Sequence, residues 1–373
     1  MDRARTPLAF MMVCGLFLFA GCTAQEPVKI GFIGGMSGRV ADLGISGRNG
    51  VVLAIEQKNA RGGVNGRKLE LLVRDDEQNP EVANRVVAEL LEQKIELIVG
   101  PMTSSMATAI LPRINASQTI LISPTVTSSS LAAKDDNFLR ICGDTREYAE
   151  KSADFQFRHQ KKRTVAAIYD LNNRAYSEVW LNEFRASFEK NGGRMQKAAG
   201  FHSGASTVFQ ELVRDLLSGQ PDLALVIANS VDAGIIVQQI RKLAPKQAIA
   251  LSEWPSTERF IELAGGAAEG AFVSQFFNRE NSRPSYKLFR DAYRTRFGGQ
   301  EPGFAALAGY DATLAAIEGF EKRTTGEPLK QALLRIGRFS GAQQEFVIDR
   351  FGDAVRPTFI SVVRNGSYHT LEY

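Results

Sequence analysis

Short apolar runs alternate with amphipathic stretches along most of this chain, and this alternation limits its fold more than any other feature. Apolar runs of this length predict strands, and the stretches between them predict helices. In the first part of the chain the predicted strands are Val28–Ile33, Leu69–Arg74, Ile95–Val99 and Thr119–Ser123, with helices near residues 47–60, 80–93 and 104–116. This order of elements predicts a parallel sheet with helices on both faces.

The same order of elements returns in the second part of the chain. The predicted strands there are Thr164–Tyr169, Arg194–Ala199, Leu223–Ile227 and Ala248–Leu251, with helices near residues 177–191, 207–218, 231–243 and 257–264. The remainder leaves the series and predicts helices near residues 284–297, 303–322 and 328–336 and strands near residues 271–276, 344–349, 357–363 and 368–371. We therefore predict an α/β fold in which one architecture is used twice.

The first 21 residues predict an export signal rather than part of the fold. Two arginines precede the apolar run Leu8–Ala20, which is short for a membrane span. Small residues then precede Cys22, as in bacterial lipoprotein signals, although Phe19 stands where leucine is usual. We predict cleavage before Cys22, lipid attachment to its thiol, and a tether over residues 22–27. The lipid would hold the domain at a membrane, facing the periplasm or the cell exterior. An ordinary signal peptide with an incidental cysteine is the alternative.

The composition of the mature chain excludes some classes of partner. Cleavage would lower the net charge from +4 to +3, because the signal holds two arginines and one aspartate. A near-neutral chain with scattered basic residues argues against nucleic acid, which calls for a basic stripe. Cys142 is the one cysteine after Cys22, so the domain cannot form an internal disulfide and relies on its core. A chain of this length is expected to form two domains with substantial cores.

The segment Gly62–Pro80 (GGVNGRKLELLVRDDEQNP) reads as a helix end, a tight turn, a strand and a polar loop. Its paired glycines suit a left-handed helix cap, Asn65-Gly66 suits a turn, and Asn79-Pro80 suits the start of the next helix. Together with the chain start VKIGFIGGMSG, this segment closely resembles the Leu/Ile/Val-binding protein family. Members of this family are bilobed type I periplasmic binding proteins that serve ABC transporters.

The resemblance implies a type I periplasmic binding fold, with two doubly wound parallel-sheet lobes joined by a three-stranded hinge. In this family the chain crosses between the lobes three times, which here implies crossings near residues 141–144, 272–277 and 346–349. The first lobe would comprise residues 28–142 and 273–346, and the second lobe residues 143–272 and 347–373. The ligand would lie between the lobes, outside the carboxyl ends of the strands.

The loop Gly100–Ser105 follows a predicted strand and opens a helix, so its hydroxyls and backbone N–H groups could attract a carboxylate. Plain capping of the helix by Thr103 or Ser104 explains these residues equally well. The resemblance implies that the loop grips the α-carboxylate of the ligand, with Ser104 at the position of the family's serine.

Two further loops of the first lobe are candidates. The loop Ser123–Thr127 is rich in hydroxyls, which usually cap helices and turns. The resemblance implies that it offers a backbone carbonyl and a hydroxyl to the ligand's amino and carboxylate groups, with Thr125 and Thr127 at those positions. The glycine-rich loop Gly34–Gly38 lacks the spacing of a nucleotide-binding motif, so we expect it to line the cleft without binding a nucleotide.

The second lobe offers the segment Asp170–Tyr176 and the pair Asn229-Ser230 as candidate contacts. Tyr176 on its own is equally well explained as an exposed loop residue, whereas the resemblance implies a ring laid over a bound amino acid. Ser177 follows it where the family usually has glycine. At Asn229 or Ser230 the branched-chain-binding members have a tyrosine, and the small polar residues here put a branched-chain specificity in question.

Glu253 follows the predicted strand Ala248–Leu251 and supports the sharpest chemical hypothesis. From the sequence alone it reads as a surface carboxylate, whereas the resemblance implies an acid that faces the ligand's ammonium group. A carboxylate inside a closing cleft is unfavourable unless it is paired, so this role implies a cationic group on the ligand. We therefore expect an α-amino acid as ligand, or a related carboxylate if Glu253 lacks this role. Trp254 is either an aromatic wall or a core residue.

Few residues could support catalysis. His159, His202 and His369 lack the spacing of a metal site, no G-x-S-x-G motif occurs, and Cys142 has no flanking base. We predict a solute-binding protein rather than an enzyme, without a cofactor or a metal. We expect a monomer that delivers a small ligand to the membrane subunits of an ABC permease. The alternative is a sensor that presents its closed form to a signalling receptor, since either partner can recognise lobe closure; a hydrolase ranks far behind.

Overall fold

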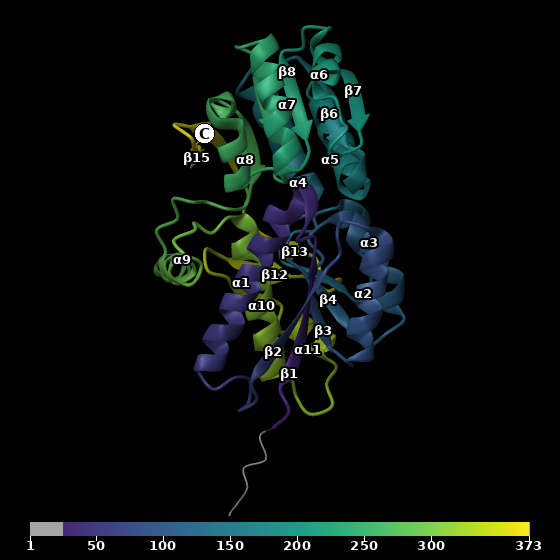
Figure 1. The fold of residues 1–373 in the computed structure, drawn as a ribbon, viewed down its shortest axis with the longest axis vertical. Helices are drawn as coiled ribbons and strands as arrows, with labels where there is room; N and C mark the ends of the chain where they lie inside the picture. Colours follow the sequence, from purple (N-terminus) through teal and green to yellow (C-terminus); the bar gives the residue numbers. More distant parts are fainter. Residues whose placement is uncertain (1–24, 373) are drawn as a thin grey trace, which may run out of the picture.

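The computed structural model describes residues 25–372. These residues form two lobes, which lie one above the other in Figure 1. The lobe nearer the N-terminus, called the first lobe, holds a parallel sheet with the strand order β2-β1-β3-β4-β5. Its strands are β1 (Val28–Gly34), β2 (Leu69–Asp75), β3 (Leu97–Val99), β4 (Ile120–Ser123) and β5 (Phe138–Arg140). Strands β3 and β4 are buried at every residue, as expected of strands covered on both faces.

Helices cover both faces of this sheet. On one face α2 (Pro80–Glu92) and α3 (Ser104–Asn115) pack against the apolar side chains of Ile98 and Leu121. On the other face α1 (Ala41–Ala60) and α10 (Phe304–Lys322) pack against Val99 and Ile122. The remaining helical elements of this lobe are η1 (Gly38–Val40), η2 (Ser129–Leu131), α9 (Pro284–Arg296) and α11 (Leu329–Ile336).

Helices α1 and α10 approach each other closely because glycines lie at their contact. A Cβ atom added at Gly50 would lie 2.0 Å from the Ala306 carbonyl oxygen, and one at Gly309 would lie 2.3 Å from the Gly47 carbonyl oxygen. Backbone atoms therefore fill the space that a side chain would need. This contact fixes the direction of α1, whose N-terminal end reaches the second lobe (Figure 1).

The second lobe holds a seven-stranded sheet with the order β15-β14-β10-β9-β8-β6-β7. Strands β6 to β10 are parallel to their neighbours, and β14 and β15 add an antiparallel hairpin at one edge. The strands are β6 (Thr164–Asp170), β7 (Arg194–Phe201), β8 (Leu223–Ile227), β9 (Ala248–Leu251), β10 (Phe272–Gln275), β14 (Phe359–Arg364) and β15 (Ser367–Thr370). The helical elements are α4 (Thr145–Arg158), η3 (Leu171–Asn173), α5 (Arg174–Lys190), α6 (Phe209–Leu217), α7 (Ser230–Leu243), α8 (Glu258–Ala264) and η4 (Gly265–Ala268).

The chain crosses between the lobes after β5, after β10 and after a small three-stranded sheet. That sheet has the order β11-β12-β13 and consists of β11 (Arg338–Ser340), β12 (Glu345–Ile348) and β13 (Ala354–Val355). It adjoins the first lobe, since the Arg140 backbone N–H donates to the Gly352 carbonyl oxygen at 2.9 Å. The predicted lobe boundaries at residues 273 and 347 fall inside β10 and β12. The corresponding crossings come later in the chain, after β10 and β13 have ended.

Two further findings concern the described residues. Within residues 25–372, no helix combines the length and the apolar character that a bilayer crossing needs. The same part of the chain contains no grouping of histidine, cysteine and carboxylate side chains suited to a metal ion.

Candidate functional site

A small cavity lies between the two lobes, where loops leave the carboxyl ends of their parallel strands. The first lobe lines it with Leu43, Met102, Thr103, Ser104, Thr125 and Phe304, and the second lobe with Asn173, Tyr176, Glu253 and Trp254. Four of the predicted contact residues are thus brought together at one place: Ser104, Thr125, Tyr176 and Glu253.

The N-terminal end of α3 forms one side of the cavity. Extended backbone at Thr103 turns the chain into the helix, and Ser104 is the first helical residue. Thr103 makes no side-chain cap, because its hydroxyl donates to Gln78 Oε1 at 3.0 Å. The Ser104 Oγ accepts a hydrogen bond from the Ser128 backbone N–H at 3.3 Å. The helix end at the cavity therefore lacks a side-chain cap from Thr103, and its backbone amides and partial positive charge suit an anion.

Asn173 of the second lobe meets this helix end across the cleft. Its Oδ1 accepts a hydrogen bond from the Ser105 backbone N–H at 3.0 Å. In the opposite direction, the Ala175 backbone N–H donates to Ser105 Oγ at 3.3 Å. These two hydrogen bonds join the start of α3 to the start of α5 beside the cavity, so they belong to the closed arrangement of the lobes.

Thr125 and Thr127 lie on the loop after β4 and make different contacts. The Thr125 hydroxyl donates to the Met102 carbonyl oxygen at 2.6 Å, which ties this loop to the loop before α3. The Thr127 hydroxyl crosses the cleft and donates to Glu253 Oε1 at 3.0 Å. Thr125 therefore lines the cavity, whereas Thr127 supports the acid on its far side.

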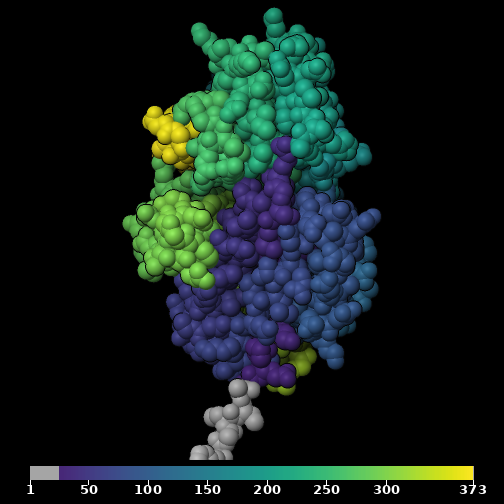
Figure 2. All heavy atoms as spheres, in the orientation of Figure 1, coloured from purple at the N-terminus to yellow at the C-terminus, as the bar shows by residue number. Residues whose placement is uncertain are grey.

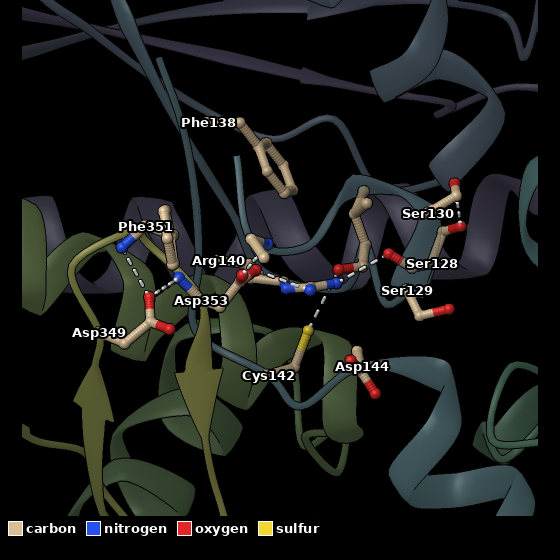
Figure 3. Close-up of polar contacts among 12 residues, drawn as sticks. Ser128, Ser129, Ser130, Phe138, Arg140, Cys142, Asp144, Asp349, Phe351 and Asp353 are labelled. Atoms are coloured by element: carbon tan, nitrogen blue, oxygen red, sulfur yellow. Dashed lines mark hydrogen bonds and ion pairs between the residues drawn. The ribbon is translucent and has the colours of Figure 1, made fainter. Parts of the chain in front are cut away.

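Buried polar groups hold this loop from behind (Figure 3). The Cys142 thiol donates to the Val126 carbonyl oxygen at 3.6 Å, and Arg140 Nη1 donates to the Ser128 carbonyl oxygen at 3.0 Å. Burial raises the pKa of the Cys142 thiol to about 12, so the thiol stays neutral and can donate. The buried charge of Arg140 is balanced by Asp353 at 2.7 Å. These contacts fix the loop on which Thr125 and Thr127 lie.

Glu253 follows β9 by two residues, and 6% of its surface is exposed. Besides the bond from Thr127, its Oε2 accepts a hydrogen bond from the Trp180 indole N–H at 2.9 Å. Both partners are neutral, and within the described chain no cationic side chain forms an ion pair with Glu253. Burial raises the pKa of Glu253 from its ordinary 4.5 to about 7, against the lowering effect of its hydrogen bonds. A cationic group in the cavity would find a carboxylate without a counter-charge.

Tyr176 and Trp254 form an aromatic wall of the cavity. Their rings meet edge to face, with centroids 5.6 Å apart and planes at 81°. Tyr176 is buried in the first turn of α5 rather than exposed in a loop, and Trp254 is also buried. The buried hydroxyls of Tyr176 and Ser252 make no well-formed hydrogen bond with the described residues. The Tyr176 hydroxyl interacts with the Ser252 hydroxyl and the Glu253 carboxylate, and both hydroxyls keep bonding capacity for a ligand or water.

Asn229 and Ser230 lie outside this cavity. The Asn229 Oδ1 caps α7 by accepting from the Asp232 backbone N–H at 3.0 Å, and its Nδ2 donates to the Asp232 carboxylate at 2.7 Å. The Ser230 hydroxyl donates across the cleft to Asp42 Oδ2 at 2.7 Å. A ligand contact of Asn229 or Ser230 stays a prediction, and it requires a ligand that extends beyond the cavity.

Three residues of the site lie outside every loop that the sequence analysis singled out. Leu43 in α1 and Phe304 in α10 line the cavity, and Trp180 in α5 supports Glu253 from behind. Trp180 follows Tyr176 by four residues and so shares its face of the helix, which was a usable signal. Nothing in the sequence links Leu43 to Phe304, because only tertiary packing brings them together. Cys22, the predicted lipid site, lies outside the described residues.

Two α/β lobes, each with strand-end loops at a shared cavity, are typical of a protein that closes around a small molecule. The chain belongs to the periplasmic binding protein family, whose model, described as "Periplasmic binding protein", matches residues 27–367. The leucine-, isoleucine-, valine-, threonine- and alanine-binding protein of Pseudomonas aeruginosa is 25% identical over 357 residues, covering 94% of this chain and 93% of that protein.

Solved structures agree on the fold. A leucine-binding protein of Thermotoga maritima matches with a TM-score of 0.85 at 24% identity, over 92% of this chain and 98% of that one. A solute-binding protein of R. palustris in complex with benzoate matches with a TM-score of 0.84 at 17% identity, over 92% of this chain and 95% of that one. The predicted fold class and family are confirmed.

Proposed function

We propose that the protein captures an α-amino acid between its lobes and delivers it to the membrane subunits of an ABC transporter. The observation that carries this proposal is Glu253, a buried carboxylate at the cavity whose protein partners are both neutral. An ammonium group would supply the missing positive charge at the place where the protein supplies none. The relative from Pseudomonas aeruginosa, named as an amino-acid-binding protein, supports the same class of ligand.

The two ends of the cavity differ in charge, and this difference orients the proposed ligand. Its carboxylate would lie at the N-terminal end of α3, near Ser104 and Thr125. Its ammonium group would lie against Glu253. The side chain would contact the apolar part of the lining, which consists of Leu43, Met102, Phe304 and Trp254.

Closure completes the site in this proposal. The open first lobe binds the ligand through Ser104 and Thr125, and hinge motion then brings Tyr176 and Glu253 over it. The membrane subunits would recognise the closed form. A lipid on Cys22 would keep the domain close to those subunits, since it restricts diffusion to the membrane surface.

A thermal-shift screen of the domain that begins after Cys22, against the common amino acids and a panel of small carboxylic acids, tests the proposal. A ligand at about 100 times its Kd adds roughly 2.7 kcal/mol of stability, which is readily visible. Glu253→Ala should then weaken amino-acid binding by about 2–5 kcal/mol, as expected for one partner of a buried charged pair. The matched control Glu211→Ala removes an exposed carboxylate of the same lobe and should change nothing. Shifts only with acids that lack an amine would overturn the role of Glu253.

A further inference from the structure

A second group of contacts crosses the cleft at the N-terminal end of α1, apart from the cavity lining. Asp42, in the first turn of α1, accepts two hydrogen bonds on its Oδ2 atom. One comes from the Ser230 hydroxyl at 2.7 Å and the other from the Thr257 hydroxyl at 2.8 Å. Ser230 is the first residue of α7, and Thr257 is the N-cap of α8. One carboxylate of the first lobe thus accepts hydrogen bonds from hydroxyls at the starts of two helices of the second lobe.

Arg39, three residues before Asp42, forms an ion pair across the cleft in which the first lobe supplies the positive charge. Its Nη1 lies 2.5 Å from Asp232 Oδ1, and its Nη2 donates to the Gly204 carbonyl oxygen at 2.9 Å. Asp232 lies in the first turn of α7 and is completely buried. Its hydrogen bonds from its own lobe come from neutral groups, the Ser203 hydroxyl and the Asn229 amide. The cation that balances this buried carboxylate therefore comes from the opposite lobe.

The start of α1 reaches the second lobe. Figure 2 shows the N-terminal end of α1, in purple, pressed against the green and teal atoms of the upper lobe. Neither Arg39 nor Asp42 lines the cavity. Their contacts join the two lobes outside that cavity, and Arg39 lines a neighbouring cavity with Asn229 and Trp254.

We propose that residues 39–42 form an interlobe latch that stabilises the closed form and thereby sets ligand affinity without touching the ligand. In this proposal, which rests on the proposed solute-binding function, Arg39 and Asp42 are positioning residues. Opening the cleft separates Arg39 from Asp232 and removes the cation that pairs with this carboxylate in the closed form. Opening also replaces both hydroxyl partners of Asp42 with water. Asp42 accepts from hydroxyls at the starts of α7 and α8, and Arg39 pairs with Asp232 of α7, so the two residues together also fix the register in which the lobes close.

The latch has a kinetic consequence. A ligand first meets the open form, in which the latch is broken, so the association rate should not depend on Asp42. Release requires reopening, so the dissociation rate should rise by the factor by which the closed form is destabilised. A hydrogen bond to a charged group corresponds to roughly a ten- to hundredfold change in such an equilibrium.

Closure can be measured without any ligand by cross-linking. Cysteines placed by Ser105→Cys and Ala175→Cys would lie on opposite lobes at positions whose Oγ and N atoms are 3.3 Å apart in the closed form. Their rate of disulfide formation is proportional to the closed population, however small that population is. In the domain that begins after Cys22, adding Asp42→Ala should slow this rate roughly ten- to hundredfold. Asp42→Asn keeps an acceptor oxygen but no charge and should give an intermediate rate.

Glu81→Ala is the matched control. Glu81 also lies in the first turn of a first-lobe helix, α2, so its removal causes the same loss of a helix-dipole contact. It is exposed, and its variant should cross-link at the parental rate. Equal rates for Asp42→Ala and Glu81→Ala would overturn the latch, as would absence of cross-linking in the parental pair. Because no ligand is used, this result is separate from a failure of the amino-acid screen, which would overturn the proposed function instead.

Discussion

Glu253 shows how placement alone gives one side chain its chemistry. It follows a buried strand, faces a loop of the opposite lobe, and has the Trp180 indole behind it. Burial disfavours its charged form, whereas the hydrogen bonds from Thr127 and Trp180 favour it. The result is a carboxylate with a pKa of about 7, which a cationic ligand would return to the charged form.

The pH dependence of stability should therefore change in Glu253→Gln. An acid whose pKa is higher in the folded protein stabilises the fold below its unfolded value near 4.5 and loses this contribution as pH rises to about 7. Glutamine has no charge to bury, so at pH 8 the ligand-free variant should be more stable than the parent by roughly 1–3 kcal/mol. At pH 4.5 the difference should vanish. Urea unfolding across this range measures it, and parallel profiles would contradict the account.

The sequence predicted one half of the site better than the other. Ser104 and Thr125 lie on loops that follow predicted strands, and both line the cavity at the carboxyl ends of those strands, where the rule for open sheets leads one to look. Asn229 also follows a strand, yet its amide is taken up by the Asp232 carboxylate and by capping α7. Local position could not reveal this, because Asp232 becomes a partner only once the helix has formed.

Among the elements, continuous apolar segments were predictable, and a helix whose buried face consists partly of small residues was not. The strands Leu223–Ile227 and Ala248–Leu251 have the predicted bounds. Helix α4 was not predicted, because its buried face includes Ala149, Ser152 and Ala153, which give little apolar periodicity. Its start signal was present: the Asp144 carboxylate accepts from the Arg146 backbone N–H at 3.0 Å.

Gly50→Ala should test the contact between α1 and α10. In an exposed helix this change would stabilise by up to about 1 kcal/mol. Here the new methyl group would lie 2.0 Å from the Ala306 carbonyl oxygen, so the helices must separate. We expect a loss of roughly 1–3 kcal/mol in the free energy of unfolding, measured with urea.

Gly266→Ala supplies the comparison for this helix contact. A Cβ atom at Gly266 would have no heavy atom within 4 Å, so this variant should stay within about 0.5 kcal/mol of the parent. If Gly50→Ala proved as stable as Gly266→Ala, the close approach of α1 and α10 would be refuted.

On the scale of the whole molecule, Arg356 ties the three crossings together. It pairs with the buried Asp311 at 2.7 Å and donates to the Ile141 carbonyl oxygen at 3.4 Å, at the first crossing. Its guanidinium also lies 4.8 Å from the ring centroid of Phe276, at the second crossing. Arg356 itself begins the third crossing. One buried cation therefore connects the segments about which the lobes would move.

Asp311→Ala should accordingly destabilise the protein strongly, because it leaves Arg356 buried without its counter-charge. We expect a loss of about 3–5 kcal/mol in the free energy of unfolding, measured by urea unfolding. Removing the exposed partner of another ion pair, by Asp135→Ala opposite Lys330, should change stability far less, because an exposed ion pair contributes little. Similar values for the two variants would show that the hinge does not depend on this pair.

The central claim is that the cleft recognises the ammonium group of an amino acid through Glu253. Calorimetric titration with the amino acid that gives the largest thermal shift, and then with the carboxylic acid that differs only by lacking its amine, tests this claim directly. The account predicts that the acid binds more weakly by about 2–5 kcal/mol, and that Glu253→Ala removes most of this difference. Equal affinity for the two compounds in the parent protein would contradict it.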